Sequence, residues 1–160
     1  MNNKYSNPQL WMLVVLRVAI GWHLLYEGIV KLMNPNWSSV GYLMDSKGWF
    51  AGVFHSIASN PGILQVADFL NIWGLILIGL GLVLGLFTRA ATIAGITLLG
   101  LYYLSHPALI NANYVIPSDG SYIFVNKNLI EMLALVVLLL FPTGRIIGID
   151  RFIFRKVAAR

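Results

Sequence analysis

The sequence has no cysteine and few charged residues. Without a thiol, the chain cannot form a disulfide, a thiolate metal site, a thiolate-held iron–sulfur cluster or a dithiol redox centre of its own. Any redox chemistry therefore needs a centre borrowed from another molecule. Only 11% of the 160 residues are charged, 58% are hydrophobic and the mean hydropathy is +0.76, far above the range of soluble proteins. This composition predicts a membrane protein.

Four long apolar segments approach the roughly 20 residues that a membrane-spanning helix needs. They cover about residues 9–32, 63–87, 89–106 and 122–142. Pro8, Pro61 and Pro142 mark boundaries, because proline is tolerated in the first turn of a helix but not in its interior. The pattern predicts an all-α, integral membrane four-helix bundle. Residues 1–160 would form one transmembrane domain that ends in a basic cytoplasmic tail, 143–160.

Lysine and arginine gather on one side of the predicted membrane region. Lys4 precedes the first segment, Arg89 lies between the second and third, and five basic residues follow the fourth. The loops on the opposite side contain Lys47 as their only lysine or arginine. Since cytoplasmic ends retain basic residues, both termini of this multi-pass protein are expected to be cytoplasmic. The pI of about 9.7 therefore reflects mainly the orientation of the chain in the membrane. Attraction of the basic residues to phospholipids of the lipid bilayer is expected to add modestly. Nucleic acid is not expected as a partner.

The loop at about 33–61 is too polar to span a membrane but is rich in aromatic residues. These are Trp37, Tyr42, Trp49, Phe50 and Phe54. Aromatic rings favour the headgroup level, so this segment between helices 1 and 2 is expected to lie on the outer interface, partly helical. Two roles stay open for it: an interfacial anchor, or a lid over a binding site.

Ionisable side chains occur inside the first apolar segment, in LRVAIGWHLLYEGIVKL. At about 100° per residue, His23, Glu27 and Lys31 form one stripe of a helix, with Arg17 at its edge. The other segments add polar residues in the same outer layer: Asp68, Asn71, His106, Asn128 and Glu131. One charged residue at the centre of a membrane helix opposes insertion by about 2.5–3.5 kcal/mol, so several such residues are expected only where they pair, line a wet cavity or serve a function. Because these polar residues lie in one layer on several helices, they predict a pocket near the outward-facing surface, with Arg17 deeper in the membrane.

These residue types suit a quinone headgroup, which needs hydrogen-bond donors at its carbonyl oxygens and an acid–base group. His23 and Glu27 are the expected proton-handling pair, and Glu131 is the third candidate catalytic residue. The candidate ligand-binding residues are Arg17, Lys31, Asp68, Asn71, His106 and Asn128. Haem would require His23 and His106 as facing ligands and is disfavoured. No metal site is predicted, because no histidine has a second histidine four residues away.

Structural roles stay open for the same residues. Glu27 and Lys31 fit an ordinary i, i+4 pair that reaches the interface, worth about 0.2–0.5 kcal/mol on an exposed helix. A hydrogen-bonded network could also simply hold the helices together. The run GLGLVLG, 79–85, lacks the spacing and the preceding strand of a dinucleotide motif, so its glycines are expected to allow close helix packing.

Three stretches resemble the DoxX family. They are LRVAIGWHLLYEGIVKL, with Arg17, Gly21, Gly28 and Lys31; GLGLVLGLFTRAATIAG, with Thr88 and Arg89; and NKNLIEMLALVVLLLFPTGRIIGID, ending in Gly148 and Asp150. The resemblance implies a four-helix protein of a prokaryotic cytoplasmic (inner) membrane with a redox role. Its DoxD-like relatives include the membrane subunit of thiosulfate:quinone oxidoreductase, which works with a second subunit to oxidise thiosulfate to tetrathionate. The resemblance does not assign a catalytic role to any residue of this chain.

The sequence leaves three functions to compare. The first is a membrane subunit of a quinone-linked oxidoreductase, with non-covalent quinone as cofactor, a small reductant such as thiosulfate and a second oxidoreductase subunit as partner. The alternative is a non-catalytic membrane anchor or assembly subunit. A small-solute transporter fits less well, since no inverted repeat is discernible. Helix faces lined by glycine allow close packing between copies of the chain, so a homo-oligomer is a further alternative.

Overall fold

A computed structural model describes residues 5–108, 114–115 and 123–155. The regular elements in this described part are all helices, so the predicted all-α class is confirmed. They are α1 (Asn7–Met33), α2 (Val40–Met44), α3 (Ala51–Ser59), α4 (Pro61–Leu84), α5 (Thr88–Ser105), α6 (Lys127–Leu140) and α7 (Asp150–Arg155).

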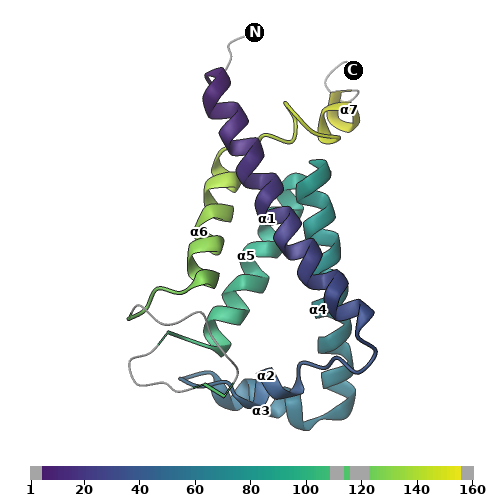
Figure 1. The fold of residues 1–160 in the computed structure, drawn as a ribbon, viewed down its shortest axis with the longest axis vertical. Helices are drawn as coiled ribbons and strands as arrows, with labels where there is room; N and C mark the ends of the chain where they lie inside the picture. Colours follow the sequence, from purple (N-terminus) through teal and green to yellow (C-terminus); the bar gives the residue numbers. More distant parts are fainter. Residues whose placement is uncertain (1–4, 109–113, 116–122, 156–160) are drawn as a thin grey trace.

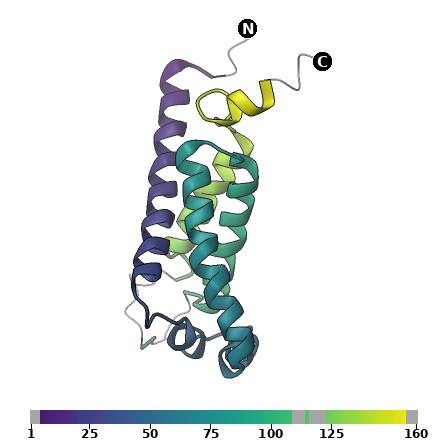
Figure 2. The ribbon, with the colours of Figure 1, turned by 90° about the vertical axis from the view of Figure 1, so that its right-hand side faces the viewer.

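The four long helices α1, α4, α5 and α6 run side by side along the long axis (Figures 1 and 2). Helix α1 packs mainly on α4, α4 also packs on α5, and α5 packs on α6. The short helices α2 and α3 lie across one end of this group, and α7 lies at the other (Figure 1). The start of α1 and helix α7 share that second end, as expected if both termini face the same side.

Two helices are long and apolar enough to cross a membrane, judged by length and composition. Helix α1 has 27 residues and α4 has 24, with mean hydropathies of 1.6 and 2.0. Helices α5 and α6 contain 18 and 14 residues, fewer than the roughly 20 that a straight span uses. Crossing by α5 and α6, and a cytoplasmic position for the termini, therefore stay predictions.

Local caps move two helix ends away from the predicted positions. Helix α4 ends at Leu84 rather than near residue 87, because Gly85 adopts a left-handed conformation (φ 66°) that stops the helix. Helix α6 begins at Lys127, not near residue 122, because Asn126 is extended and its side chain accepts a hydrogen bond from the Leu129 N–H at 3.0 Å. Residue 122 itself lies outside the described residues.

The aromatic segment between α1 and α4 is partly helical, as predicted, since it contains α2 and α3. Asp68 on α4 holds the residue that precedes α2. Its carboxylate accepts hydrogen bonds from the backbone N–H of Ser39, at 2.9 Å, and from the Ser39 hydroxyl. Tyr42 on α2 donates to the Tyr102 carbonyl of α5 at 3.3 Å. These contacts hold α2 against the ends of α4 and α5.

Glycine allows α1 and α4 to approach closely. A methyl group built on Gly79 would lie 2.5 Å from the backbone nitrogen of Leu25 and 2.7 Å from the carbonyl oxygen of Gly21. Gly81 meets Ala91 in the same way on the α5 side. The predicted packing role of the glycine run is therefore confirmed for Gly79 and Gly81, whereas Gly85 forms the turn. Around these contacts lies a core of fully buried leucines: Leu24, Leu75, Leu82, Leu99 and Leu135.

Candidate functional site: a polar cavity beneath α2

A cavity of about 540 Å³ lies between α1, α4, α5 and α6, next to the α2 segment. Six of the residues predicted from the sequence line it: His23, Glu27, Lys31, Asn71, Asn128 and Glu131. Its other polar or aromatic lining residues are Trp37, Ser38, Ser39, Tyr42, Tyr102 and Lys127. The volume lies within the range of about 300–1,000 Å³ that is typical of small-molecule sites.

His23 of α1 contacts Glu131 of α6 on one wall of this cavity. The His23 Nδ1 lies 2.7 Å from Glu131 Oε1, and the two side chains are 34% and 11% exposed. The second oxygen, Glu131 Oε2, is buried and has no hydrogen-bond partner among the described residues. The sequence paired His23 with Glu27. The structure instead places Glu131 against the imidazole, because His23 lies on a face of α1 that meets α6.

A chain of hydrogen bonds between α1, α4 and α5 forms another part of the cavity wall. Lys31 Nζ donates to Asn71 Oδ1 at 3.0 Å, and Asn71 Nδ2 donates to the Tyr102 hydroxyl oxygen at 2.7 Å. An ammonium group can only donate, so it fixes which way the Asn71 amide points. Tyr102 must then accept from Asn71, which leaves its own O–H proton free to donate elsewhere. Lys31 also lies over the Trp37 ring, 5.1 Å from its centroid.

Glu27 has a peripheral place in the cavity. Its Oε2 lies 4.0 Å from Lys31 Nζ, as the i, i+4 spacing predicted, but its side chain is 47% exposed. Lys127 and Asn128, at the start of α6, line the same cavity. Two lysines and two glutamates therefore share the cavity, so their formal charges cancel, and a protonated His23 would make the net charge of the cavity +1.

Three predicted site residues lie outside this cavity. Asp68 binds Ser39, so it supports the α2 segment. His106 stacks on Tyr42, with ring centroids 3.9 Å apart, and lies 4.7 Å from the Tyr114 ring. Burial lowers the pKa of His106, partly opposed by the Asp45 carboxylate 3.9 Å away. His106 therefore stacks with aromatic rings and does not line the cavity that contains His23.

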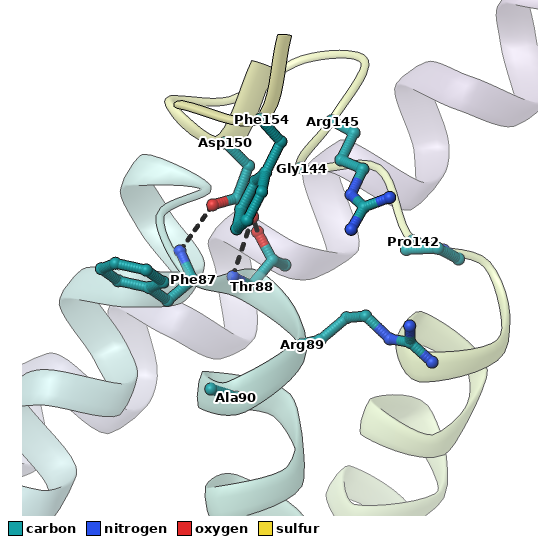
Figure 3. Close-up of a pocket in the computed structure, with 9 residues that line it drawn as sticks. All are labelled: Phe87, Thr88, Arg89, Ala90, Pro142, Gly144, Arg145, Asp150 and Phe154. Atoms are coloured by element: carbon teal, nitrogen blue, oxygen red, sulfur yellow. Dashed lines mark hydrogen bonds between the residues drawn. The ribbon is translucent and has the colours of Figure 1, made fainter. Parts of the chain in front are cut away.

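Arg17, the third of these, lies near the α7 end. It is only 2% exposed, and it donates to the Thr143 hydroxyl at 2.9 Å and to the Ile147 carbonyl at 2.8 Å. Arg17 therefore binds the connection between α6 and α7 rather than a ligand in the cavity. The same connection is held by Asp150, which accepts hydrogen bonds from the N–H groups of Phe87 and Thr88 at 2.7 and 2.9 Å (Figure 3).

Sequence reasoning missed several residues of the cavity. Tyr102 stands in an apolar run with no partner at helical spacing, and Trp37 and Tyr42 looked like interfacial aromatics. Their position in the site depends on how the α2 segment folds back over the helices. Lys127 was not among the predicted site residues, although it lines the cavity. Among the described residues, no group of three His, Asp or Glu side chains is arranged as a metal site.

The membrane-capable helices and the polar cavity enclosed by helices define a class, that of α-helical membrane proteins. Within this class the chain belongs to the DoxX family, whose model matches residues 12–107. The match runs from α1 to the end of α5 and includes His23, Lys31, Asn71 and Tyr102, while Glu131 lies beyond it. No curated protein and no solved structure matches the chain.

Proposed function

We propose that this chain is a membrane subunit of a quinone-linked oxidoreductase and that the cavity beneath α2 receives the quinone headgroup. The observation that carries the proposal is the His23–Glu131 contact of 2.7 Å on one wall of a cavity of about 540 Å³. A proton-transfer pair and a wall of hydrogen-bond donors face the same space. A quinone supplies two-electron chemistry that this cysteine-free chain lacks.

The His23–Glu131 pair is suited to hold and move a proton. Glu131 occupies Nδ1 of the imidazole, so the ring orientation is fixed and Nε2 is the nitrogen left to exchange a proton with a bound oxygen. The carboxylate stabilises the imidazolium that forms when His23 takes up a proton. Glu131 is thus proposed as the orienting partner of His23, in place of Glu27, the partner predicted from helical spacing.

Tyr102 and Lys31 supply further hydrogen-bond donors in the cavity. The Tyr102 hydroxyl has a proton to donate because Asn71 Nδ2 occupies it as an acceptor. Lys31 brings a positive charge whose side chain is 18% exposed, next to the Trp37 ring. Lys31 and Tyr102 would stabilise negative charge that develops on a bound carbonyl oxygen. An anionic reductant such as thiosulfate would be attracted by the same charge.

Binding of a short-chain quinone tests the proposal. We expect decylubiquinone or a short-chain menaquinone to raise the melting temperature of the detergent-purified protein saturably. Glu131→Gln should weaken binding by about tenfold, because a hydrogen bond to a charged group contributes about 1.5–3 kcal/mol. His23→Gln should weaken it similarly. The measurement is a thermal-shift titration of each variant, preceded by extraction of co-purified quinone.

Glu27→Gln is the matched control, since it removes the same charge from the same cavity without touching His23. We expect it to change quinone affinity by less than about threefold, as an exposed ion pair contributes little. If no quinone shifts the melting temperature, or if Glu27→Gln is the more damaging variant, the site as proposed is wrong. A loss of stability in every variant without any ligand dependence would favour the non-catalytic anchor.

A further inference from the structure

A second cavity, of about 250 Å³, lies at the opposite end of the helices, between the start of α5 and the α6–α7 connection. Rings and aliphatic carbon form much of its wall, from Phe87, Ala90, Pro142 and Phe154. Arg89 and Arg145 also line it, and Figure 3 shows both guanidinium groups directed into the same space beside Pro142. The cavity thus combines an apolar wall with two cations.

Neither cation is neutralised by the described part of the chain. No described residue accepts a hydrogen bond from Arg89 or Arg145, and the Arg145 guanidinium group lies over the Phe154 ring, 5.0 Å from its centroid. Asp150 also lines the cavity, but it is 4% exposed and accepts three hydrogen bonds from Phe87 and Thr88. No hydrogen bond or ion pair joins this buried carboxylate to either arginine among the described residues, so the two guanidinium groups are left for an outside anion.

The position of this cavity matches the headgroup level of a membrane. It lies beside the turn at which α4, a membrane-capable helix, ends and α5 begins. Large apolar side chains are exposed around it: Phe87 is 58% exposed, Phe141 47% and Phe152 73%. Aromatic and arginine side chains together are typical of the membrane interface, where rings meet the acyl boundary and guanidinium groups reach the phosphates.

We propose that this second cavity binds one anionic phospholipid. The phosphate would lie between Arg89 and Arg145, and the first part of an acyl chain would lie against Phe87 and Phe154. The carbon wall distinguishes this ligand from free inorganic phosphate, which has nothing to place there. Two arginines and a single, largely buried carboxylate line the cavity, so an anionic headgroup is favoured over a zwitterionic one. The inference does not depend on the proposed quinone site.

Native mass spectrometry of the delipidated, full-length protein in detergent tests this proposal. The probe is dioctanoyl phosphatidylglycerol, compared with dioctanoyl phosphatidylcholine and with inorganic phosphate. We expect saturable binding of one phosphatidylglycerol, weaker binding of phosphatidylcholine, and no competition by phosphate at the same concentration. Arg89→Gln and Arg145→Gln should each weaken phosphatidylglycerol binding by about fivefold, from about 1 kcal/mol for each basic residue near anionic lipid.

Two further variants keep the test decisive. Arg151→Gln removes the same charge from an exposed position on α7 that does not line the cavity, and it should leave binding unchanged. Ala90→Phe fills the cavity without changing charge and should weaken binding as much as the arginine variants. Equal binding of both lipids, full competition by phosphate, an Arg151→Gln effect as large as that of Arg89→Gln, or an inert Ala90→Phe would each overturn the proposal.

Discussion

Gly79→Ala is expected to lower the free energy of unfolding by about 3 kcal/mol, at the upper end for overpacking by one carbon. The added methyl carbon would lie 2.5 Å from the backbone nitrogen of Leu25 and 2.6 Å from the Leu25 Cβ. Backbone and Cβ atoms cannot rotate away, so α1 and α4 must separate. Because His23 is on α1 and Asn71 on α4, the cavity should be distorted too. Denaturation in mixed micelles, followed by circular dichroism, measures the effect.

Gly74→Ala is the matched control for this prediction. Gly74 is on the same helix, and a methyl group there meets no other atom within 4 Å. Alanine has the higher helix propensity, so this variant should be neutral or more stable by up to about 1 kcal/mol. Equal changes in stability for the two variants would show that Gly79 is no more sensitive to alanine than Gly74, which contradicts the close approach of α1 and α4 at Gly79.

Arg17→Gln is expected to lower the free energy of unfolding by about 2–4 kcal/mol. The guanidinium group holds the α6–α7 connection through Thr143 and the Ile147 carbonyl, and buried acceptors that lose their donors are each destabilised by about 1–3 kcal/mol. The connection should loosen locally. Hydrogen exchange should therefore accelerate at the amides of Ile149 and Asp150, which donate to the carbonyls of Leu84 and Gly85.

Two other arginine substitutions complete this test. Arg17→Lys keeps the charge but cannot donate to both acceptors in a fixed fork, so its stability should be intermediate. Arg151→Gln removes one positive charge from an exposed position on α7 and should change stability by less than about 0.5 kcal/mol. If Arg17→Gln is as mild as Arg151→Gln, then the hydrogen bonds of Arg17 to the α6–α7 connection do not contribute to stability as proposed.

The long helices and most of the cavity residues could be predicted from the sequence because both depend on regular spacing. Apolar length marks α1 and α4, and the four-residue spacing of His23, Glu27 and Lys31 places them on one face. Where the spacing rule ends, the predictions fail. The start of α6 depends on the Asn126 cap, and the end of α4 on the left-handed Gly85, which are single-residue effects that an apolar window does not detect.

Pairings across helices were the harder part of the site. Spacing along α1 made Glu27 the obvious partner of His23, but the partner in space is Glu131, which is 108 residues away. Likewise, Arg17 and His106 had the right polarity for the site, yet packing assigns Arg17 to the α6–α7 connection and His106 to an aromatic cluster. Helix rotation and loop folding decide these contacts, and neither leaves a periodic signal in the sequence.

Fluorescence of Trp37 gives the most direct test of the central claim that a quinone headgroup enters the cavity beneath α2. Trp37 lines this cavity beside Lys31, and its contribution is isolated by subtracting the signal of Trp37→Phe from that of the wild type. The account predicts saturable quenching of this difference signal by decylubiquinone, with about tenfold weaker affinity in Glu131→Gln. Linear quenching that is identical in wild type, Trp37→Phe and Glu131→Gln would contradict it.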